Sequence, residues 1–263
     1  MLPPERHSRI LQALRDAPAV RVAGLAAALD VSEMTIRRDI EILDEQQLLK
    51  KFHGGASRLN ALSSIEPGFA SKADRQLAAK RSIAREALGL IEPGMTIALG
   101  AGTTTYHLAA SLGQVEALTI ITNSIKAAEA LHQLPSQPAV IVTGGERTPS
   151  EALVGPLSIA AISTLNADMC FLGVHGVHLR GLSSPNLAEA QTNAAFIDSA
   201  NRLVVLADHS KFGLRALSSF AQIDEIDVLI TDDGISPPVR ETYQPLVAEM
   251  RIASAVPETK AAR

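Results

Sequence analysis

From Gly94 onward the chain repeats one pattern, a short apolar run followed by a turn and a stretch with helical spacing. The apolar runs lie at residues 95–99, 118–122, 139–143, 169–174, 203–207 and 228–231. Short runs without polar alternation are typical of strands that are buried on both faces. The helical stretches lie at residues 104–112, 124–134, 155–165, 187–200 and 238–250. Because strand and helix alternate, the sequence predicts an α/β domain with a mainly parallel sheet.

The first 60 residues follow a different pattern. Helices are predicted around residues 10–17, 21–29 and 32–43. The third helix begins at Ser32, whose side chain can accept hydrogen bonds from free amides, and its residues Ile36, Ile40 and Leu43 form one apolar stripe. Residues 48–56 alternate briefly and turn on two glycines, as a β-hairpin does. Three helices and a hairpin predict a winged helix-turn-helix domain.

The third helix also carries a polar surface. Thr35, Arg37 and Arg38 lie in its first turns. In a helix-turn-helix protein these turns meet base edges and phosphates, and guanidinium groups suit both targets. The alternative is an ordinary amphipathic helix whose arginines are solvated or pair with Asp39 and Glu41. We hypothesise that the helix reads DNA.

The sequence of this region resembles a known family. Residues 32–40 (SEMTIRRDI), followed by residues 51–56 (KFHGGA), are similar to the helix-turn-helix and wing of the DeoR family of bacterial transcriptional regulators. One departure is Gln47, where the family more often has a glycine, and it implies a small change in how the helix ends. The residues predicted to contact DNA are Ser32, Thr35, Arg37, Arg38, Lys51 and His53.

The remainder of the chain resembles the C-terminal effector domain of the same family. The matching pieces are residues 102–104, 118–123, 143–145, 181–183, 207–213 and 230–232. The resemblance implies a fold similar to that of ribose-5-phosphate isomerases. It also implies a phosphorylated sugar or related metabolite as the ligand, which changes the hold of the protein on its operator. We therefore expect a DNA-binding repressor of carbohydrate-metabolism genes, and not an enzyme.

Polar turns follow the predicted strands, and in parallel sheets ligands bind beyond the carboxyl ends of the strands. Residues 100–105 place glycines and hydroxyls at a helix start, where free amides favour an anion. Lys211 adds a positive charge that can meet a phosphate. Each turn alone could simply connect two elements. The residues predicted to bind the effector are Gly100, Gly102, Thr103, Thr104, Thr105, Asn123, Gly144, Gly145, Gly176, Glu189 and Lys211.

Two departures from the family concern this ligand site. Family members often have an aspartate where this chain has Gly100, so a carboxylate that could bind sugar hydroxyls is missing. A Val-Lys pair often follows the Glu-Ala pair that stands here at Glu189 and Ala190, but this chain continues with residues 191–193 (QTN) and lacks that positive charge. We expect a retained phosphate cradle and an altered sugar-reading part.

The predicted domains are a head at residues 1–60, a linker at 61–72, an effector-binding domain at 73–256 and a tail at 257–263. The composition, with 46% hydrophobic and 20% charged residues, is typical of a soluble globular protein. The net charge of −4 is a poor match for DNA. Binding would therefore depend on a local basic cluster and on pairing of two heads in a dimer or tetramer, since one head spans only a half-site. The cluster consists of Arg6, Arg9, Arg37, Arg38, Lys50, Lys51 and Arg58.

Several classes of protein are disfavoured. Cys170 is the single cysteine and stands in an apolar run, so we expect a buried thiol and no intrachain disulfide. Zinc-finger spacing is absent, and no cofactor is predicted. The chain has no apolar run of membrane-spanning length and no secretory signal at its N-terminus, which favours the cytoplasm.

Two rival interpretations start from polar residues in the predicted loops. An isomerase needs a general base near the substrate carbon, and candidate groups are Asp168, His175, Glu189, Asp208 and Lys211. The missing carboxylate at Gly100 makes a complete active site less favourable. A metal site is the other alternative, and its candidate ligands are His175, His178 and His209. Loop histidines are more often solvated or bonded to backbone, so no metal is predicted.

Overall fold

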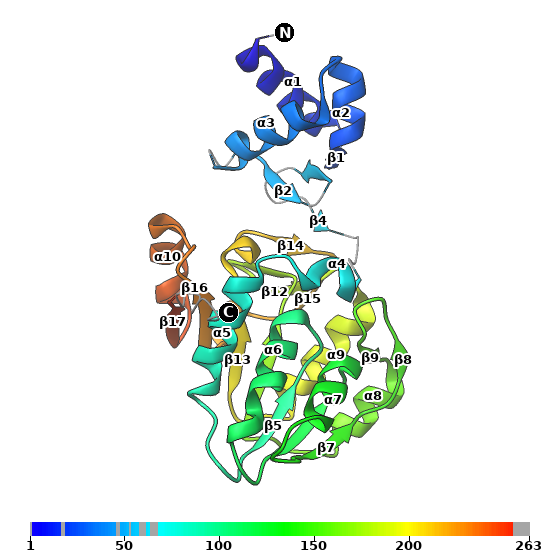
Figure 1. Ribbon diagram of the computed structural model, residues 1–263, viewed down its shortest axis with the longest axis vertical. Helices are drawn as coiled ribbons and strands as arrows, with labels where there is room; N and C mark the ends of the chain where they lie inside the picture. The colour runs from blue at the N-terminus through cyan, green and yellow to red at the C-terminus, as the bar shows by residue number, and fades with distance from the viewer. Residues whose placement is uncertain are drawn as a thin grey trace, which may run out of the picture. The chain divides into compact units, whose positions relative to one another are not determined.

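The computed structural model describes residues 2–16, 19–45, 48–52, 54–57, 62–63 and 68–254. The chain forms two compact units, Met1–Leu62 and Ser63–Arg263, which we call the head and the body (Figure 1). The strand β4, Leu62–Ser63, spans the division between them.

The described head contains helices and a small antiparallel sheet. Its elements are α1 (Pro3–Asp16), β1 (Ala19–Arg21), α2 (Val22–Leu29), α3 (Glu33–Glu45), β2 (Lys50–Phe52) and β3 (Gly55–Ser57). The strands pair in the order β1-β3-β2. The predicted helices and the predicted hairpin are therefore confirmed. The extra strand β1 was not expected, because it is three residues long and pairs with residues far along the chain.

The core of the head is built on the apolar stripe of α3. Ile36, Ile40 and Leu43 are at most 1% exposed and pack with apolar residues of α1 and α2. The Thr35 amide donates to Ser32 Oγ at 3.2 Å, so Ser32 caps the helix as predicted. The N-terminal turn of α3 is thereby fixed while its other face remains polar.

A buried charge cluster joins α1 to α3. Arg6 donates to both carboxylate oxygens of Asp39, with Nη2 at 2.9 Å from Oδ1, and a ring nitrogen of His7 lies 3.0 Å from the same oxygen. Burial acts to raise the pKa of Asp39, but the hydrogen bonds from Arg6 and His7 outweigh it and hold the pKa below its ordinary value. Arg6 is only 8% exposed, so its inclusion in the basic surface cluster is wrong.

The body is organised around a seven-stranded parallel sheet with the order β17-β16-β13-β10-β5-β6-β7. Its strands are β5 (Thr96–Leu99), β6 (Thr119–Thr122), β7 (Ala139–Val142), β10 (Met169–Gly173), β13 (Leu203–Leu206), β16 (Val228–Asp232) and β17 (Glu249–Ala253). All six predicted strands are present, and the predicted mainly parallel sheet is confirmed.

The edge strand β17 corrects the sequence prediction of a helix at residues 238–250. The helix α10 spans only Pro237–Tyr243, a 3-10 turn covers Gln244–Leu246, and the chain then enters β17. Polar residues alternate with apolar ones along β17, and Arg251 donates to Glu249 at 2.6 Å. The strand therefore lacks the continuous apolar run that marked the other strands.

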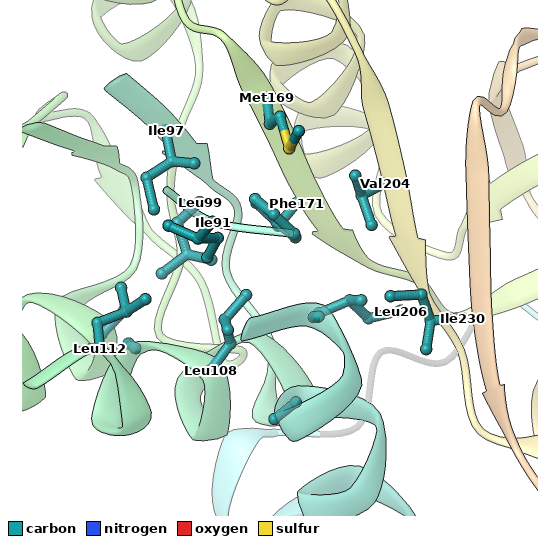
Figure 2. Close-up of a cluster of buried hydrophobic side chains, with 14 of the residues drawn as sticks. Ile91, Ile97, Leu99, Leu108, Leu112, Met169, Phe171, Val204, Leu206 and Ile230 are labelled. Carbon is teal, nitrogen blue, oxygen red and sulfur yellow. The ribbon is translucent and has the colours of Figure 1, made fainter. Parts of the chain in front are cut away.

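Helices cover both faces of the sheet. They are α4 (Phe69–Ala73), α5 (Leu77–Leu88), α6 (Thr103–Ser111), α7 (Ile125–His132), α8 (Pro156–Ile162) and α9 (Leu187–Asp198), followed by α10. Side chains of α5, α6 and α7 pack on one face, and side chains of α8, α9 and α10 pack on the other. Figure 2 shows the first of these layers, where Leu99, Phe171 and Leu206 of neighbouring strands meet Leu108 and Leu112.

Cys170 belongs to the opposite face of the sheet and is fully buried. Burial raises the pKa of its thiol far above the ordinary value. The expectation of a buried thiol that packs as a small hydrophobe is confirmed.

Short strands and 3-10 turns lie outside the main sheet. A three-stranded antiparallel sheet contains β11 (Gly176–His178), β12 (Gly181–Ser184) and β15 (Ser218–Ala221), and β8 (Glu146–Arg147) pairs with β9 (Leu153–Val154). The remaining elements are β14 (Arg215–Ala216) and the 3-10 turns at Leu112–Gln114, His209–Lys211 and Ile223–Glu225. These elements were not predicted, because they are two to four residues long and combine polar residues with small ones.

The Asp39 cluster generates the first prediction. Replacing Asp39 with Asn leaves the buried Arg6 charge uncompensated, so α1 and α3 should open more readily and exchange their amide protons faster. In the parent protein, the contribution of Asp39 should be present at neutral pH and lost as the pH falls below about 4 through the lowered pKa. Hydrogen–deuterium exchange of peptides from α1 and α3 measures both effects.

The matched control is Asp30→Asn, which changes an exposed carboxylate at the end of α2 and should leave the exchange unaltered. Equal protection of α1 and α3 in the Asp39→Asn variant and the parent would contradict the assigned role of the cluster.

Candidate functional site

The carboxyl ends of the parallel strands gather polar turns from distant parts of the sequence. The Ala101 amide after β5 donates to Asn123 Oδ1 after β6 at 2.9 Å, and Asn123 Nδ2 donates to the Leu153 carbonyl oxygen at 3.0 Å. Asn123 is 2% exposed. The structure therefore brings the predicted residue Asn123 to this edge, where its side chain links the turns after β5 and β6 to strand β9.

The turn after β5 leads directly into α6. Gly102 precedes the first helical residue, and Thr103, Thr104 and Thr105 are all buried. No side chain of the described residues caps this end, and the first intrahelical bond runs from the Tyr106 amide to the Gly102 carbonyl oxygen at 3.0 Å. The amides of the three threonines thus precede the helical hydrogen-bond ladder, which is the arrangement that suits an anion.

A carboxylate lies at the start of α9. Glu189 accepts a hydrogen bond from Thr148 Oγ1 at 2.9 Å, and Ser184 Oγ lies 3.5 Å from its other oxygen. Asn186 caps the same helix by accepting from the amides of Ala188 and Glu189. The predicted residue Glu189 is therefore held between the β8–β9 segment and the end of β12.

Three lysines surround this edge. Lys72 Nζ donates to Ser150 Oγ at 3.0 Å, Lys80 Nζ donates to the Lys72 carbonyl oxygen, and Lys80 interacts electrostatically with Lys211 and Asp208. Lys80 is 3% exposed. Burial lowers its pKa to about 8, an effect that Asp208 opposes and the neighbouring cations strengthen. An excess of positive charge of this kind favours an anionic ligand.

Contacts of Asp208 and Asp232 fix the loop that carries Lys211. Asp208 Oδ1 accepts from the Ser210 amide at 3.0 Å, and His209 Nδ1 lies 2.6 Å from Asp232 Oδ2. Burial acts to raise the pKa of Asp232, but hydrogen bonds from His209 lower it overall. His209 therefore has a structural partner, and the described residues contain no group of three or more potential metal ligands.

The predicted glycines beyond β7 and β10 have packing explanations. A Cβ atom at Gly145 would lie 2.4 Å from the Val154 carbonyl oxygen, and a Cβ at Gly176 would lie 2.4 Å from the Leu214 carbonyl oxygen. Gly144 has a φ of +72°, which favours glycine without regard to any ligand. Gly144 and Gly145 shape the turn after β7 and Gly176 begins β11, and the predicted contact of these residues with an effector stays a prediction.

In the head, the two arginines on the polar face of α3 differ in their contacts. Arg37 Nη2 lies 3.0 Å from Glu33 Oε2, and Lys51 Nζ pairs with Glu41. Arg38 is exposed and makes no hydrogen bond or ion pair with the described residues. Of the alternative pairings considered above, Asp39 pairs with Arg6 instead, and Glu41 forms its ion pair with Lys51 while it interacts with Arg38 only through their charges. Arg38 is thus the guanidinium most open to a ligand.

Ser32, Thr35 and His53 are the other residues of the head that were predicted to contact DNA. Ser32 and Thr35 share a hydrogen bond of 2.9 Å between their hydroxyl oxygens, at the exposed start of α3. His53 lies outside the described residues.

Comparison with known proteins gives a separate match for each of the two units. Residues 6–61 match the DeoR-like helix-turn-helix domain, and residues 75–233 match the DeoR C terminal sensor domain. The chain belongs to the DeoR family. It is a transcriptional regulator whose head is a DNA-binding domain and whose body senses a small effector. The alternative of a sugar-phosphate isomerase-like enzyme is therefore wrong.

Relatives in this family span nearly the whole chain. A putative aga operon transcriptional repressor of Escherichia coli O157:H7 is 34% identical over 88% of this chain and 87% of the relative. The glycerol-3-phosphate regulon repressor of Haemophilus influenzae is 31% identical over 87% of this chain and 89% of the relative. A D-ribose-5-phosphate isomerase in complex with phospho-erythronic acid is 20% identical over 51% of this chain and 52% of that chain, with a TM-score of 0.39. That score is too low to support an argument about the site.

The two departures of this DeoR-family chain are neighbours in space. A Cβ atom at Gly100 would lie 3.8 Å from Asn193 Oδ1. The positions that lack a carboxylate and a cation therefore adjoin each other at the strand ends. The Leu172 side chain also lies against Gly100, with Cδ2 2.5 Å from the same Cβ position.

Lys72 and Lys80 were missed as site residues. Lys80 stands three residues after Leu77 and three before Ile83, on the apolar stripe of α5. A lysine on a core stripe was the signal that could have found it.

In the described part of this DeoR-family chain, no helix has the length and apolar character needed to cross a membrane.

The second prediction concerns the titration of Lys80. Its amine should titrate near pH 8, because burial disfavours the charged form. The surface residue Lys126 offers an internal comparison, because its hydrogen bond to Glu129 raises its pKa. NMR of lysine side chains, assigned with Lys80→Arg and Lys126→Arg variants, measures both. Titration of Lys80 at the ordinary lysine pH would show that its amine is not buried as described.

Proposed function

We propose that this protein is an oligomeric repressor of carbohydrate-metabolism genes that is released from its operator, or held on it, by a phosphorylated sugar or related metabolite. The observation that carries the proposal is the buried amine of Lys80 beside Lys72 and Lys211, at the sheet edge where α6 begins without a side-chain cap. A phosphate group would neutralise the lysines and accept hydrogen bonds from the free amides.

The polar residues at the same edge suit a hydroxylated ligand. Glu189 can accept hydrogen bonds from sugar hydroxyls in place of Thr148 and Ser184, with which it now interacts. At the same strand ends the Asn193 side chain lies near Gly100, and neither residue carries a charge. A neutral part of the metabolite would face these two residues, because a charged group there would find no opposite charge on either residue. The relative named for glycerol 3-phosphate is consistent with a phosphorylated ligand.

For the head, we infer that α3 lies in the major groove. Arg38 would contact base edges or phosphates, while Arg37 would first have to leave Glu33, an exposed pair that contributes little. Ser32 and Thr35 would lie near the bases, with Lys51 and His53 of the wing near phosphates. Because one head spans only a half-site, the active species would be a dimer or tetramer in the cytoplasm.

The regulatory step would be a shift between two arrangements of the protein. A metabolite changes this equilibrium only if it binds one arrangement more tightly than the other. The lysines that would bind phosphate lie on three separate segments, α4, α5 and the turn after β13. Binding would therefore draw these segments together, and the strength of DNA binding would change with their position.

The experiment that tests this function is a thermal-shift screen of the whole protein against phosphorylated sugars, sugar alcohols and their unphosphorylated counterparts. A phosphorylated ligand at a hundred times its dissociation constant should stabilise the body by about 2.7 kcal/mol. Positive compounds are then tested for their effect on binding to DNA selected from a random pool. The shift should vanish in a Lys80→Met variant and persist in Lys126→Met.

A screen in which unphosphorylated sugars stabilise the protein equally well would contradict the phosphate part of the proposal. Stabilisation without any change in DNA binding would contradict the regulatory part.

The DNA-binding hypothesis gives a separate prediction for two adjacent arginines. Arg38→Ala should weaken binding to the selected DNA by about 1–3 kcal/mol if the guanidinium contacts a base in bidentate geometry. Arg37→Ala should weaken binding less, because removing Arg37 also removes the competing pair with Glu33. Fluorescence anisotropy at one fixed salt concentration measures both, with Arg240→Ala on α10 of the body as a control. Equal affinities for the Arg38→Ala variant and the parent protein would rule out the assigned contact.

A further inference from the structure

An open groove of about 300 Å³ lies between α5 and α6, away from the strand-end edge. Arg81 and Arg85 of α5 line one side, and His107 and Ser111 of α6 line the other, above Ala84 and Leu88. Both helices run from the carboxyl edge of the sheet toward its amino edge. Residues four apart lie on one face of a helix, so Arg81 and Arg85 share a face of α5, and His107 and Ser111 share a face of α6. The groove is therefore lined by two matched pairs of polar side chains.

This groove is distinct from the proposed effector site. His107 and Ser111 stand four and eight residues after the first residue of α6, which places them about 6 and 12 Å along the helix axis. On α5, Lys80 is buried toward the strand ends, whereas Arg81 and Arg85 are exposed. Different residues of the same two helices thus face the two locations.

The charges in the groove are unbalanced. Arg81 and Arg85 make no hydrogen bond or ion pair with the described residues, and no acidic residue lines the groove. Glu86, between them in sequence, instead pairs with Arg251 at 3.5 Å. Like charges four residues apart on a helix repel each other, so the helix is less stable with both than with one. An anion between the guanidinium groups would remove this repulsion.

The neighbouring side chains complete a set of donors. Burial lowers the pKa of His107, and the charges of Arg81 and Lys80 lower it further, so its ring is neutral near pH 7 and can donate one N–H. Ser111 Oγ donates to the His107 carbonyl oxygen at 2.8 Å, which holds the two α6 residues together. Two guanidinium forks and an imidazole are the donors that match the oxygens of a phosphate.

We propose that the groove between α5 and α6 is a second anion site, which binds a phosphate group, either as inorganic phosphate or as the end of a small phosphate monoester. The apolar floor formed by Ala84 and Leu88 accommodates the carbon portion of an ester. The groove is lined by other residues than the effector edge, so its ligand need not be the metabolite that controls DNA binding.

The test is a titration of the full-length protein with inorganic phosphate, followed through the imidazole resonances by NMR at constant pH and ionic strength. The His107 resonance is assigned with a His107→Asn variant. Saturable movement of that resonance is expected, with at least tenfold weaker binding in the Arg81→Gln/Arg85→Gln double variant. A second arm with glycerol phosphate distinguishes an ester site, which should bind the ester more tightly, from a site for free phosphate.

Two further variants keep the outcome specific. Arg81→Lys/Arg85→Lys retains both charges but not the forked geometry, and it should bind with intermediate affinity. Lys211→Ala disables the effector edge and should leave the His107 response unchanged, so failure of one site is distinguishable from failure of the other. A His107 resonance that does not move, or that moves equally in the double glutamine variant, would overturn the proposal. Far-ultraviolet circular dichroism checks that each variant is folded.

Discussion

Parallel pairing throughout the seven-stranded sheet is the constraint on which the body depends. Every neighbouring pair in the sheet runs in the same direction, so each turn that follows a strand emerges at one edge. Asn123 links the turns after β5 and β6, and the segment after β13 adds Lys211. Residues more than a hundred positions apart thereby come to one edge of the sheet, although each belongs to a short local connection.

A comparable constraint in the head is the buried pairing of Arg6 with Asp39. It fixes α1 against α3 and occupies the one carboxylate of α3 that points inward. The exposed side of the helix then carries Arg37, engaged by Glu33, and Arg38, which is exposed. The same packing that stabilises the head therefore decides which basic side chains of α3 are exposed. Charge counted along the sequence did not contain this distinction.

Strong periodicity made most of the fold predictable. The strands at residues 95–99 and 169–174 and the stripe of Ile36 and Ile40 are recognisable because burial on a strand or a helix face imposes a regular spacing of apolar residues. β17 escaped prediction because its outer position in the sheet permits polar residues. The candidate site was predictable where glycines and hydroxyls mark a helix start, as at residues 100–105, and unpredictable at Lys80, whose burial depends on α4 and on the turn after β13.

The sequence by itself determined the two units, the order of their main elements and membership of the DeoR family, because local spacing and short motifs carry that information. Only the tertiary structure decided which charges are paired and which are open. Arg6 and Lys80 are buried, and Gly100 lies next to Asn193. The physical reason is that the pKa of a charged group and its availability to a ligand depend on burial and on neighbours within a few ångströms, and folding draws those neighbours from distant parts of the chain.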